Sequence, residues 1–327
     1  MTSKPPAPPP RGINRRDLLR LGGAGLGGLA LANVANLGGC DGASGGDGRF
    51  RFAILADTHI IDPFYTGPEG SPEDTESIFH TRERLEAARA VVNSIRPRVE
   101  LAFVCGDVVH NYPSADWDFY FENETRFDIA RSLLDGFEMP VHIGLGNHDY
   151  DIGDLPREFT HELFREKFDV APYYAVEHGG FAFLHLDNFL GKTCETGHAD
   201  YNPDMGSLGA TQLDWLEAEL ARGRPTFVFL HFPLSMIERR EDGDRDLFGL
   251  LRAHQDSIQR VVAGHWHLWM DYEESYGPPH LLCASTRYDA DAFLVVEADP
   301  RTATHRILNW DHLTWFAHDT EPWEEPG

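Results

Sequence analysis

Short apolar runs alternate with stretches of helical periodicity along most of the chain. Runs of strand length lie at Phe50–Ala56, Leu101–Cys105, Val141–Leu145, Phe181–Leu186, Thr226–Leu230, Arg260–Ala263, His280–Cys283 and Phe293–Val296. Helical patterns lie at Thr81–Ile95, Ala115–Leu134, Pro156–Lys167, Thr211–Arg222 and Arg245–His254. This alternation predicts an α/β fold, in which helices cover the sheets. Because no long helix separates the last strands, we expect the C-terminal part to supply a mostly antiparallel second sheet.

The composition is that of a folded, strongly acidic protein. Among 327 residues, 28 Lys and Arg stand against 53 Asp and Glu, so the formal charge is 28 − 53 = −25. A surface this acidic repels phosphate backbones, and a nucleic-acid duplex is therefore excluded as a general partner. The four cysteines form no CxxC pair, so neither a thiolate zinc site nor a disulfide framework is predicted.

The first residues differ in kind from the rest of the chain. Residues 1–39 hold a proline-rich start, Arg15-Arg16 and a glycine-rich, weakly apolar run, a pattern similar to a bacterial twin-arginine export signal. Leu37-Gly38-Gly39-Cys40 resembles a lipobox, at which Cys40 would be lipidated. We therefore expect export by the twin-arginine machinery and a membrane-anchored lipoprotein on the periplasmic or extracellular face. Residues 40–48 would form a flexible tether, followed by a single domain over 49–327.

Polar clusters follow five of the predicted strands directly. They are Asp57-Thr58-His59, Gly106-Asp107, Gly146-Asn147-His148-Asp149, His231 and Gly264-His265-Trp266-His267. Ligands of open α/β sheets bind outside the carboxyl ends of the strands, so the clusters are expected to converge. Any one of them alone would be read as a turn or a helix cap. Together they predict a metal site, because cations offset the repulsion between clustered carboxylates.

As an ordered set, DxH, GD, GNHD, a single His after a strand and GHxH resemble the calcineurin-like metallophosphoesterase superfamily. The match extends from about Phe50 to Thr286. The resemblance implies a four-layered αββα sandwich of two mixed β-sheets flanked by helices, with a dinuclear metal centre. The DxH and GNHD pattern is most similar to bacterial class III cyclic nucleotide phosphodiesterases and related small phosphohydrolases.

Carried over residue by residue, the resemblance implies two ligand sets. Asp57, His59 and His267 would hold the first metal; Asn147, His231 and His265 would hold the second; Asp107 would bridge them. Nitrogen and oxygen ligands without thiolate suit Mn, Fe or Zn and do not choose among them. A metal-bridging hydroxide would attack the phosphorus of a small phosphoester. His148 would protonate the leaving group, with Asp149 orienting it.

Several alternatives stay open at this level. A phosphodiester, a phosphomonoester and a nucleotide or lipid-linked pyrophosphate are all compatible substrates, and a non-catalytic metal-binding lipoprotein is a further possibility. His110 stands where purple acid phosphatases place a metal-binding Tyr, and it is either a support for the site or a loop cap. Trp266 is a stacking surface or a core residue. His198, in the long loop Asn188–Leu208, is a candidate substrate contact, and that loop is a functional cover or an ordinary surface loop.

Overall fold

The structure is a computed structural model, and it describes residues 48–151, 155–241, 245–272 and 276–318. The predicted signal segment 1–39, Cys40 and the tether up to residue 47 lie outside these ranges and stay predictions. Among the described residues, none of the helices combines the length and the apolar composition needed to span a bilayer.

Twelve strands and a set of mostly short helices make up the described part of the chain. The strands are β1 (Phe50–Leu55), β2 (Val99–Val104), β3 (Val141–Ile143), β4 (Tyr174–His178), β5 (Phe181–His185), β6 (Thr226–Phe229), β7 (Ile258–Ala263), β8 (Trp269–Asp271), β9 (His280–Leu282), β10 (Phe293–Asp299), β11 (Thr304–Ile307) and β12 (Trp315–His318). The α-helices are α3 (Pro72–Ile78), α4 (Thr81–Ser94), α5 (Phe119–Glu122), α6 (Arg126–Asp135), α7 (Asn147–Tyr150), α8 (Arg157–Phe168), α9 (Ala210–Leu220) and α10 (Leu247–Ala253). Short 3₁₀ turns lie at Lys192–Cys194, Leu234–Met236 and Trp310–His312.

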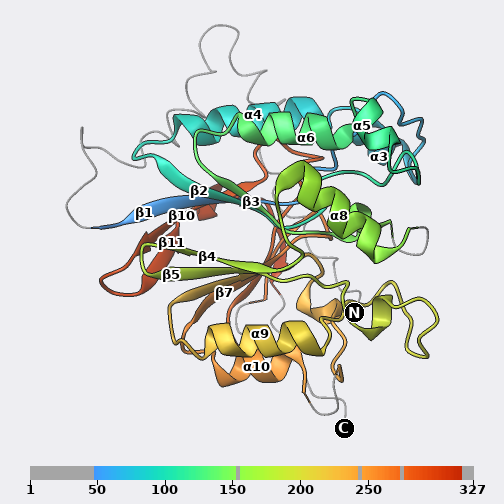
Figure 1. Cartoon of the computed structure of the whole chain (residues 1–327). Helices are drawn as coiled ribbons and strands as arrows, with labels where there is room; N and C mark the ends of the chain where they lie inside the picture. Colours follow the sequence, from blue (N-terminus) through green and yellow to red (C-terminus); the bar gives the residue numbers. More distant parts are fainter. Residues whose placement is uncertain (1–47, 152–154, 242–244, 273–275, 319–327) are drawn as a thin grey trace, which may run out of the picture.

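The strands form two mixed sheets that pack face to face. The five-stranded sheet has the order β11-β10-β1-β2-β3, and the seven-stranded sheet has the order β12-β8-β9-β7-β6-β5-β4. Helices α4 and α6 lie over the outer side of the first sheet, and α9 and α10 lie over that of the second (Figure 1). This arrangement confirms the predicted αββα sandwich.

Aromatic side chains fill the space between the sheets. Phe52 and Phe103 come from the first sheet, and Phe183, Phe227 and Phe229 come from the second. The ring centroid of Phe103 lies 4.8 Å from that of Phe183 and 4.7 Å from that of Phe229. The ring centroids of Phe52 and Phe227 are 5.0 Å apart. Alternate residues of a strand face opposite sides of a sheet, so these positions share the inner face. The alternate positions of β1, such as Ala53 and Leu55, belong to the core beneath the helices.

The C-terminal strands correct one expectation. Strands β7 and β9 pair in parallel, and β8 and β12 also pair in parallel, so the second sheet is not mostly antiparallel. In the second sheet, the pairs β8–β9 and β4–β5 are antiparallel. Strand β10 joins the other sheet, where it runs antiparallel beside β1 from Phe50↔Ala298 to Leu55↔Phe293. Phe293–Val296 are buried on both faces, and an interior position between β1 and β11 covers both.

The structure also differs from the prediction of one helix over Ala115–Leu134. This segment is divided into α5 and α6, because Thr125 and Asp128 form a reciprocal capping box that starts a new helix at Arg126.

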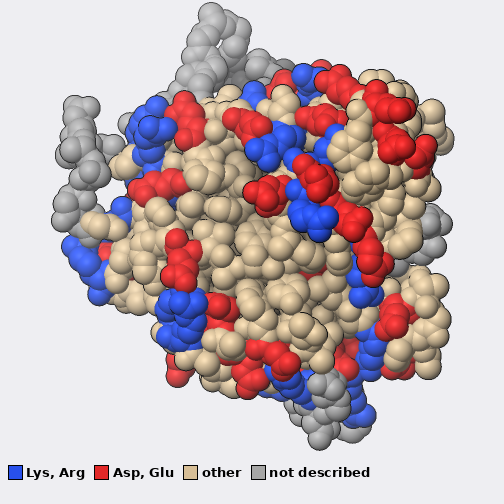
Figure 2. All heavy atoms as spheres, in the orientation of Figure 1, with Lys and Arg blue, Asp and Glu red and all other residues tan. Residues whose placement is uncertain are grey.

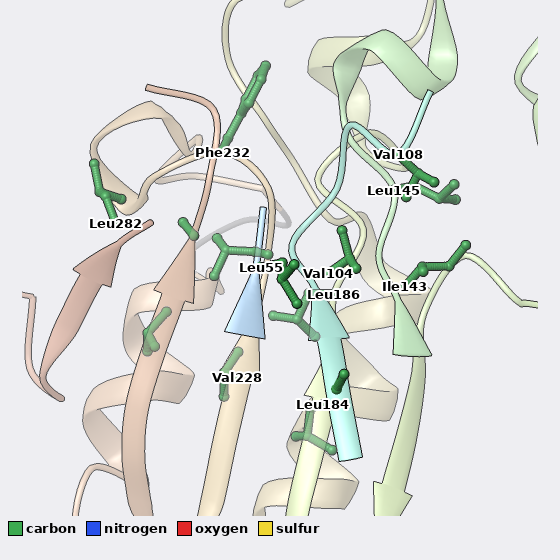
Figure 3. Close-up of a cluster of buried hydrophobic side chains, with 14 of the residues drawn as sticks. Leu55, Val104, Val108, Ile143, Leu145, Leu184, Leu186, Val228, Phe232 and Leu282 are labelled. Carbon is green, nitrogen blue, oxygen red and sulfur yellow. The ribbon is translucent and has the colours of Figure 1, made fainter. Parts of the chain in front are cut away.

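Parallel register brings the motif-bearing strand ends together. Leu55 pairs with Val104, and Val104 pairs with Ile143, so β1, β2 and β3 end level with one another. Strands β5, β6 and β7 are parallel to each other in the second sheet. Figure 3 shows apolar side chains near these strand ends, among them Leu55, Val104 and Ile143 of one buried cluster. The polar motifs that follow β1, β2, β3, β6 and β7 therefore start at a common edge.

Charged side chains on the outer surface are intermixed. On the face shown in Figure 2, basic side chains lie beside acidic ones. Arg131 pairs with Asp135 at 2.9 Å, and Arg98 pairs with Glu138 at 3.2 Å. On this face, the described residues do not form a continuous basic surface.

Candidate metal centre

The first predicted ligand set comes together at the sheet edge. Asp57, His59, Asp107 and His267 each offer a ligand atom, and these atoms lie within 4.8 Å of one another. Nε2 of His267 is 3.3 Å from Oδ1 of Asp57 and 3.1 Å from Nε2 of His59. Asp57 and His59 follow β1 of the first sheet, and His267 follows β7 of the second. This group therefore draws on both sheets.

The second set converges beside the first. Asp107, His231 and His265 also place their ligand atoms within 4.8 Å of one another. Oδ1 of Asn147 lies 2.9 Å from Nε2 of His231, so the amide oxygen faces the same space. Again the residues come from both sheets, since Asn147 follows β3 and His231 follows β6.

Asp107 is the residue common to both groups. Its buried Oδ2 has no hydrogen-bond partner among the described residues, but it lies 3.2 Å from Nε2 of His231 and 3.5 Å from Nε2 of His59. A carboxylate oxygen between one histidine of each group is in a bridging position. The residues therefore fit two metal ions. The buried carboxylate oxygen lacks a hydrogen-bond partner, the histidine ring nitrogens converge on it, and all the donor atoms are nitrogen or oxygen.

The electrostatics of the cluster agree with a cation site. Burial lowers the pKa of His59 well below its usual value, which favours the neutral, metal-ligating imidazole. Burial opposes charge on His231, but Asp107 offsets it and raises the pKa of His231 to about 9. Burial raises the pKa of Asp107, yet the surrounding imidazoles, His231 first, lower it well below its usual range. Asp107 is thus held ionised at neutral pH.

The backbone at the ligands is strained. Asp57, His59, Asp107, His265 and His267 all have positive φ angles, between 44° and 72°. A non-glycine residue in this left-handed region costs about 1–3 kcal/mol and persists only where the surrounding structure enforces it. Such residues cluster at functional sites, and five of the seven predicted ligands share the feature.

The motif glycines are explained by close approach to the ligands. A Cβ atom on Gly146 would lie 2.3 Å from Oδ1 of Asp107, and one on Gly264 would lie 2.5 Å from Oδ2 of Asp57. Neither position has room for a side chain, because a ligand carboxylate occupies the space.

His148 lies at the rim of the cluster and is held by a residue that the sequence analysis did not select. Its Nδ1 is 2.7 Å from Oδ1 of Asn111, and its backbone N–H donates to Oδ1 of Asp107 at 2.9 Å. An amide oxygen only accepts, so Nδ1 of His148 carries a proton and Nε2 is the nitrogen available to a substrate. Asn111 follows the GD motif by four residues and has a positive φ of 57°. Apart from that proximity, no feature of the sequence distinguishes it.

Asp149 does not orient His148, which corrects the role suggested above. Its buried carboxylate accepts backbone N–H groups from Val108 (3.1 Å), Val109 (2.9 Å) and Gly146 (2.9 Å). Burial, followed by the charge of Asp107, raises the pKa of Asp149 to about 8. Asp149 thus joins the loop after β2 to the loop after β3, while the ring of His148 is bound by Asn111.

A second residue outside the predicted set supports His231. Oδ1 of Asn188 accepts the backbone N–H groups of His231 (2.9 Å) and Phe232 (2.8 Å). Asn188 begins the long loop to Leu208, so the start of this loop is part of the site's support.

The remaining candidates from the sequence differ in their burial and in their distance from the metal centre. His110 is buried against the site, with Nδ1 3.0 Å from Nδ1 of His59. Trp266 is 39% exposed rather than in the core, and its indole N–H faces Sδ of Met236 at 3.2 Å. His198 is exposed in its loop, and its recorded partners are Asp200 and neighbouring backbone rather than the metal-centre residues. Cys105 and Cys283 are buried in strand ends, as small core residues.

Comparison with known proteins identifies the family. The family model described as calcineurin-like phosphoesterase matches residues 50–269, more than half of the chain. The chain belongs to the calcineurin-like phosphoesterase family. This span contains both ligand groups and His148.

Relatives and a solved structure agree with this assignment. The chain is 26% identical over 239 residues to the human serine/threonine-protein phosphatase CPPED1, covering 67% of this chain and 70% of that protein. It is 28% identical over 241 residues to the mouse protein of the same name, with the same coverage. A dimetal phosphatase from Danio rerio has the same fold, with a TM-score of 0.52 and 18% identity, covering 76% of this chain and 92% of that one. The chain is therefore a phosphoesterase of the hydrolase class.

Proposed function

We propose that the chain hydrolyses a small phosphodiester or phosphomonoester at the cluster centred on Asp107. The observation that carries the proposal is the convergence of two ligand groups on one bridging carboxylate, with His148 beside them. When bound, two metal ions would supply Lewis acidity toward the phosphoryl oxygens and a low-pKa water as nucleophile. Asp57, His59 and His267 would hold one ion; Asn147, His231 and His265 the other.

The protein's own groups account for the rest of the reaction. The only carboxylates in the two ligand groups are Asp57 and Asp107, so two divalent ions leave the cluster net positive and able to receive a phosphate. His148, with Nδ1 anchored on Asn111, presents Nε2 and in its charged form donates a proton to the leaving oxygen. Asp57 and Asp107 are buried and lie at the bottom of the site, whereas His148 and His267 are half-buried and lie on its solvent-facing side.

The substrate is tested by a panel assay on the mature fragment, with Mn²⁺, Fe²⁺ and Zn²⁺ added separately. The panel includes a cyclic nucleotide, bis(p-nitrophenyl) phosphate, p-nitrophenyl phosphate and a nucleotide pyrophosphate. The motif resemblance to class III phosphodiesterases and the exposed ring of Trp266 beside two ligand histidines favour a diester that carries a planar group. Hydrolysis that persists unchanged in Asp107→Ala would exclude this site as its origin.

A phosphoprotein is the second candidate substrate. The CPPED1 relatives are named serine/threonine-protein phosphatases, which supports it. A phosphoserine peptide in the same panel decides between them: faster turnover of the peptide than of any diester would replace the first candidate.

We also propose that the enzyme acts outside the cytoplasm, attached by a lipidated Cys40. The support is the order of Arg15-Arg16, a weakly apolar run and Leu37-Gly38-Gly39-Cys40. Cys40→Ser should release active enzyme from membrane fractions, and Arg15→Lys with Arg16→Lys should leave unprocessed precursor in the cytoplasm. Recovery of Cys40→Ser protein entirely in washed membranes would contradict the anchor.

A further inference from the structure

A chain of three side chains, two buried and one half-buried, leads away from the metal ligand His59. Nε2 of His59 faces the first ligand group, 3.5 Å from Oδ2 of Asp107, and its Nδ1 faces the opposite way, 3.0 Å from Nδ1 of His110. Nε2 of His110 lies in turn 3.1 Å from Oε1 of Glu69. Glu69 lies 10 residues after His59 but 41 residues before His110 in the sequence. The three side chains form a continuous path from a carboxylate to the ligand.

We propose that Glu69 and His110 are positioning residues, which set the tautomer and the orientation of His59 for the first metal. This inference rests on the metal centre of the proposed function. It assigns a role to a residue whose function the sequence left open and to one that the sequence did not single out.

Proton placement along the path follows from the acceptor at its end. An ionised carboxylate only accepts, so Glu69 takes the N–H at Nε2 of His110. A neutral His110 then has a lone pair at Nδ1, which accepts the N–H at Nδ1 of His59. His59 is left with its lone pair at Nε2, on the side of the ligand group. The reverse assignment would place a proton on Nε2 of His59, where it would block a metal ion.

Glu69 is built to be ionised and fixed. Although burial favours the neutral carboxyl, Tyr65, His110 and Arg287 more than offset it and lower the pKa of Glu69. Tyr65 donates its hydroxyl to Oε1, and Nη2 of Arg287 donates to Oε2 at 3.2 Å. Arg287 is itself held, because its Nε donates to Oγ of Ser77 at 2.8 Å and its backbone N–H donates to the carbonyl oxygen of Asp57 at 3.2 Å. The carboxylate is thus tied to the loop that carries the first ligand.

The backbone of His110 is also clamped. Arg126 makes a buried, two-pronged ion pair with Asp62, with Nε to Oδ2 at 2.9 Å and Nη2 to Oδ1 at 3.0 Å. Nη1 of the same guanidinium donates to the carbonyl oxygen of His110. Because both the backbone and the ring of His110 are fixed, His110 can restrain the orientation of the His59 ring. Carboxylates that orient ligand histidines are common in metal sites, and their removal costs about 10- to 100-fold in metal affinity or activity.

The test measures Mn²⁺ binding at each group separately by titration calorimetry. A His265→Ala background retains the first group, and a His267→Ala background retains the second. In the first background, Glu69→Gln and His110→Phe should each weaken binding by about 10- to 100-fold. In the second background, they should change it by less than about 3-fold. Glu100→Gln is the matched control, because Glu100 also pairs with a histidine, Nε2 of His178 at 2.9 Å, but on the exposed surface.

A double variant distinguishes Glu69 acting through His110 from independent effects of the two residues on metal binding. If the residues act in series, Glu69→Gln with His110→Phe binds no more weakly than His110→Phe alone. Additive losses, equal losses at both groups, or unchanged Mn²⁺ binding would each overturn the proposal. Should His110→Phe fail to fold, Glu69→Gln, which keeps the shape of the side chain, decides alone. Failure of the parent chain to bind Mn²⁺, Fe²⁺ or Zn²⁺ would instead contradict the proposed function.

Discussion

Removing the carboxylate of Asp149 tests whether this residue is a structural joint or a partner of His148. Asp149 accepts three backbone N–H groups in a fully buried environment. In Asp149→Asn, the amide oxygen can replace Oδ2, which serves two of these donors, but the NH₂ group then faces the N–H of Val109. The N–H of Val109 and the new NH₂ group are then both buried donors without an acceptor, and each costs about 1–3 kcal/mol. Asp149→Ala leaves all three unpaired, so we expect a loss of at least about 3 kcal/mol.

The assay is equilibrium urea unfolding followed by tryptophan fluorescence, in the presence of a chelator so that metal binding does not contribute. Asp135→Asn is the control, since Asp135 forms only an exposed helix pair with Arg131 and should change the free energy of unfolding by less than about 0.5 kcal/mol. The reasoning fails if Asp149→Asn is as stable as the parent chain. A fall in turnover at unchanged stability would restore the role of orienting His148.

Three further substitutions test the centre itself. Asp107→Ala should abolish activity and lose one metal equivalent, because a bridging carboxylate contacts both groups; metal analysis showing two equivalents with normal turnover would remove Asp107 from the bridge. His148→Ala should retain its metals but lower turnover by about 10²- to 10⁴-fold on esters with poor leaving groups, and less on activated aryl esters; equal losses on both would argue against an acid role. Gly264→Ala should weaken metal retention, since its Cβ would lie 2.5 Å from Oδ2 of Asp57; full metal content by elemental analysis would show that the loop adapts.

The sequence was informative where a local pattern has a direct structural consequence. The apolar run Phe50–Ala56 predicts a buried strand, and β1 is buried along its whole length. The ligands were recognisable because each follows an apolar run and because a glycine precedes several of them. Parallel pairing of the strands then brings these loops to one edge.

What the sequence could not show depends on contacts between distant segments. Glu69 meets His110 only because the segment after β1 folds back over the loop after β2, and no periodicity marks that return. Asn188 and Asn111 act through a single amide oxygen each, and an isolated Asn in a loop is indistinguishable from a turn residue. The position of β10 was also hidden, because a run that is apolar on both faces fits the interior of either sheet.

Each ligand group takes residues from both sheets, and this has a consequence for assembly. His59 and His267 are 208 positions apart, and Asn147 and His231 are 84 apart, so neither group exists in a partly synthesised or half-folded chain. A chain with only the first sheet formed offers four of the seven ligands, and one with only the second sheet formed offers three, so neither completes a ligand group. Tight metal binding therefore indicates that both sheets have formed and that the loop after β7 lies against the loop after β1.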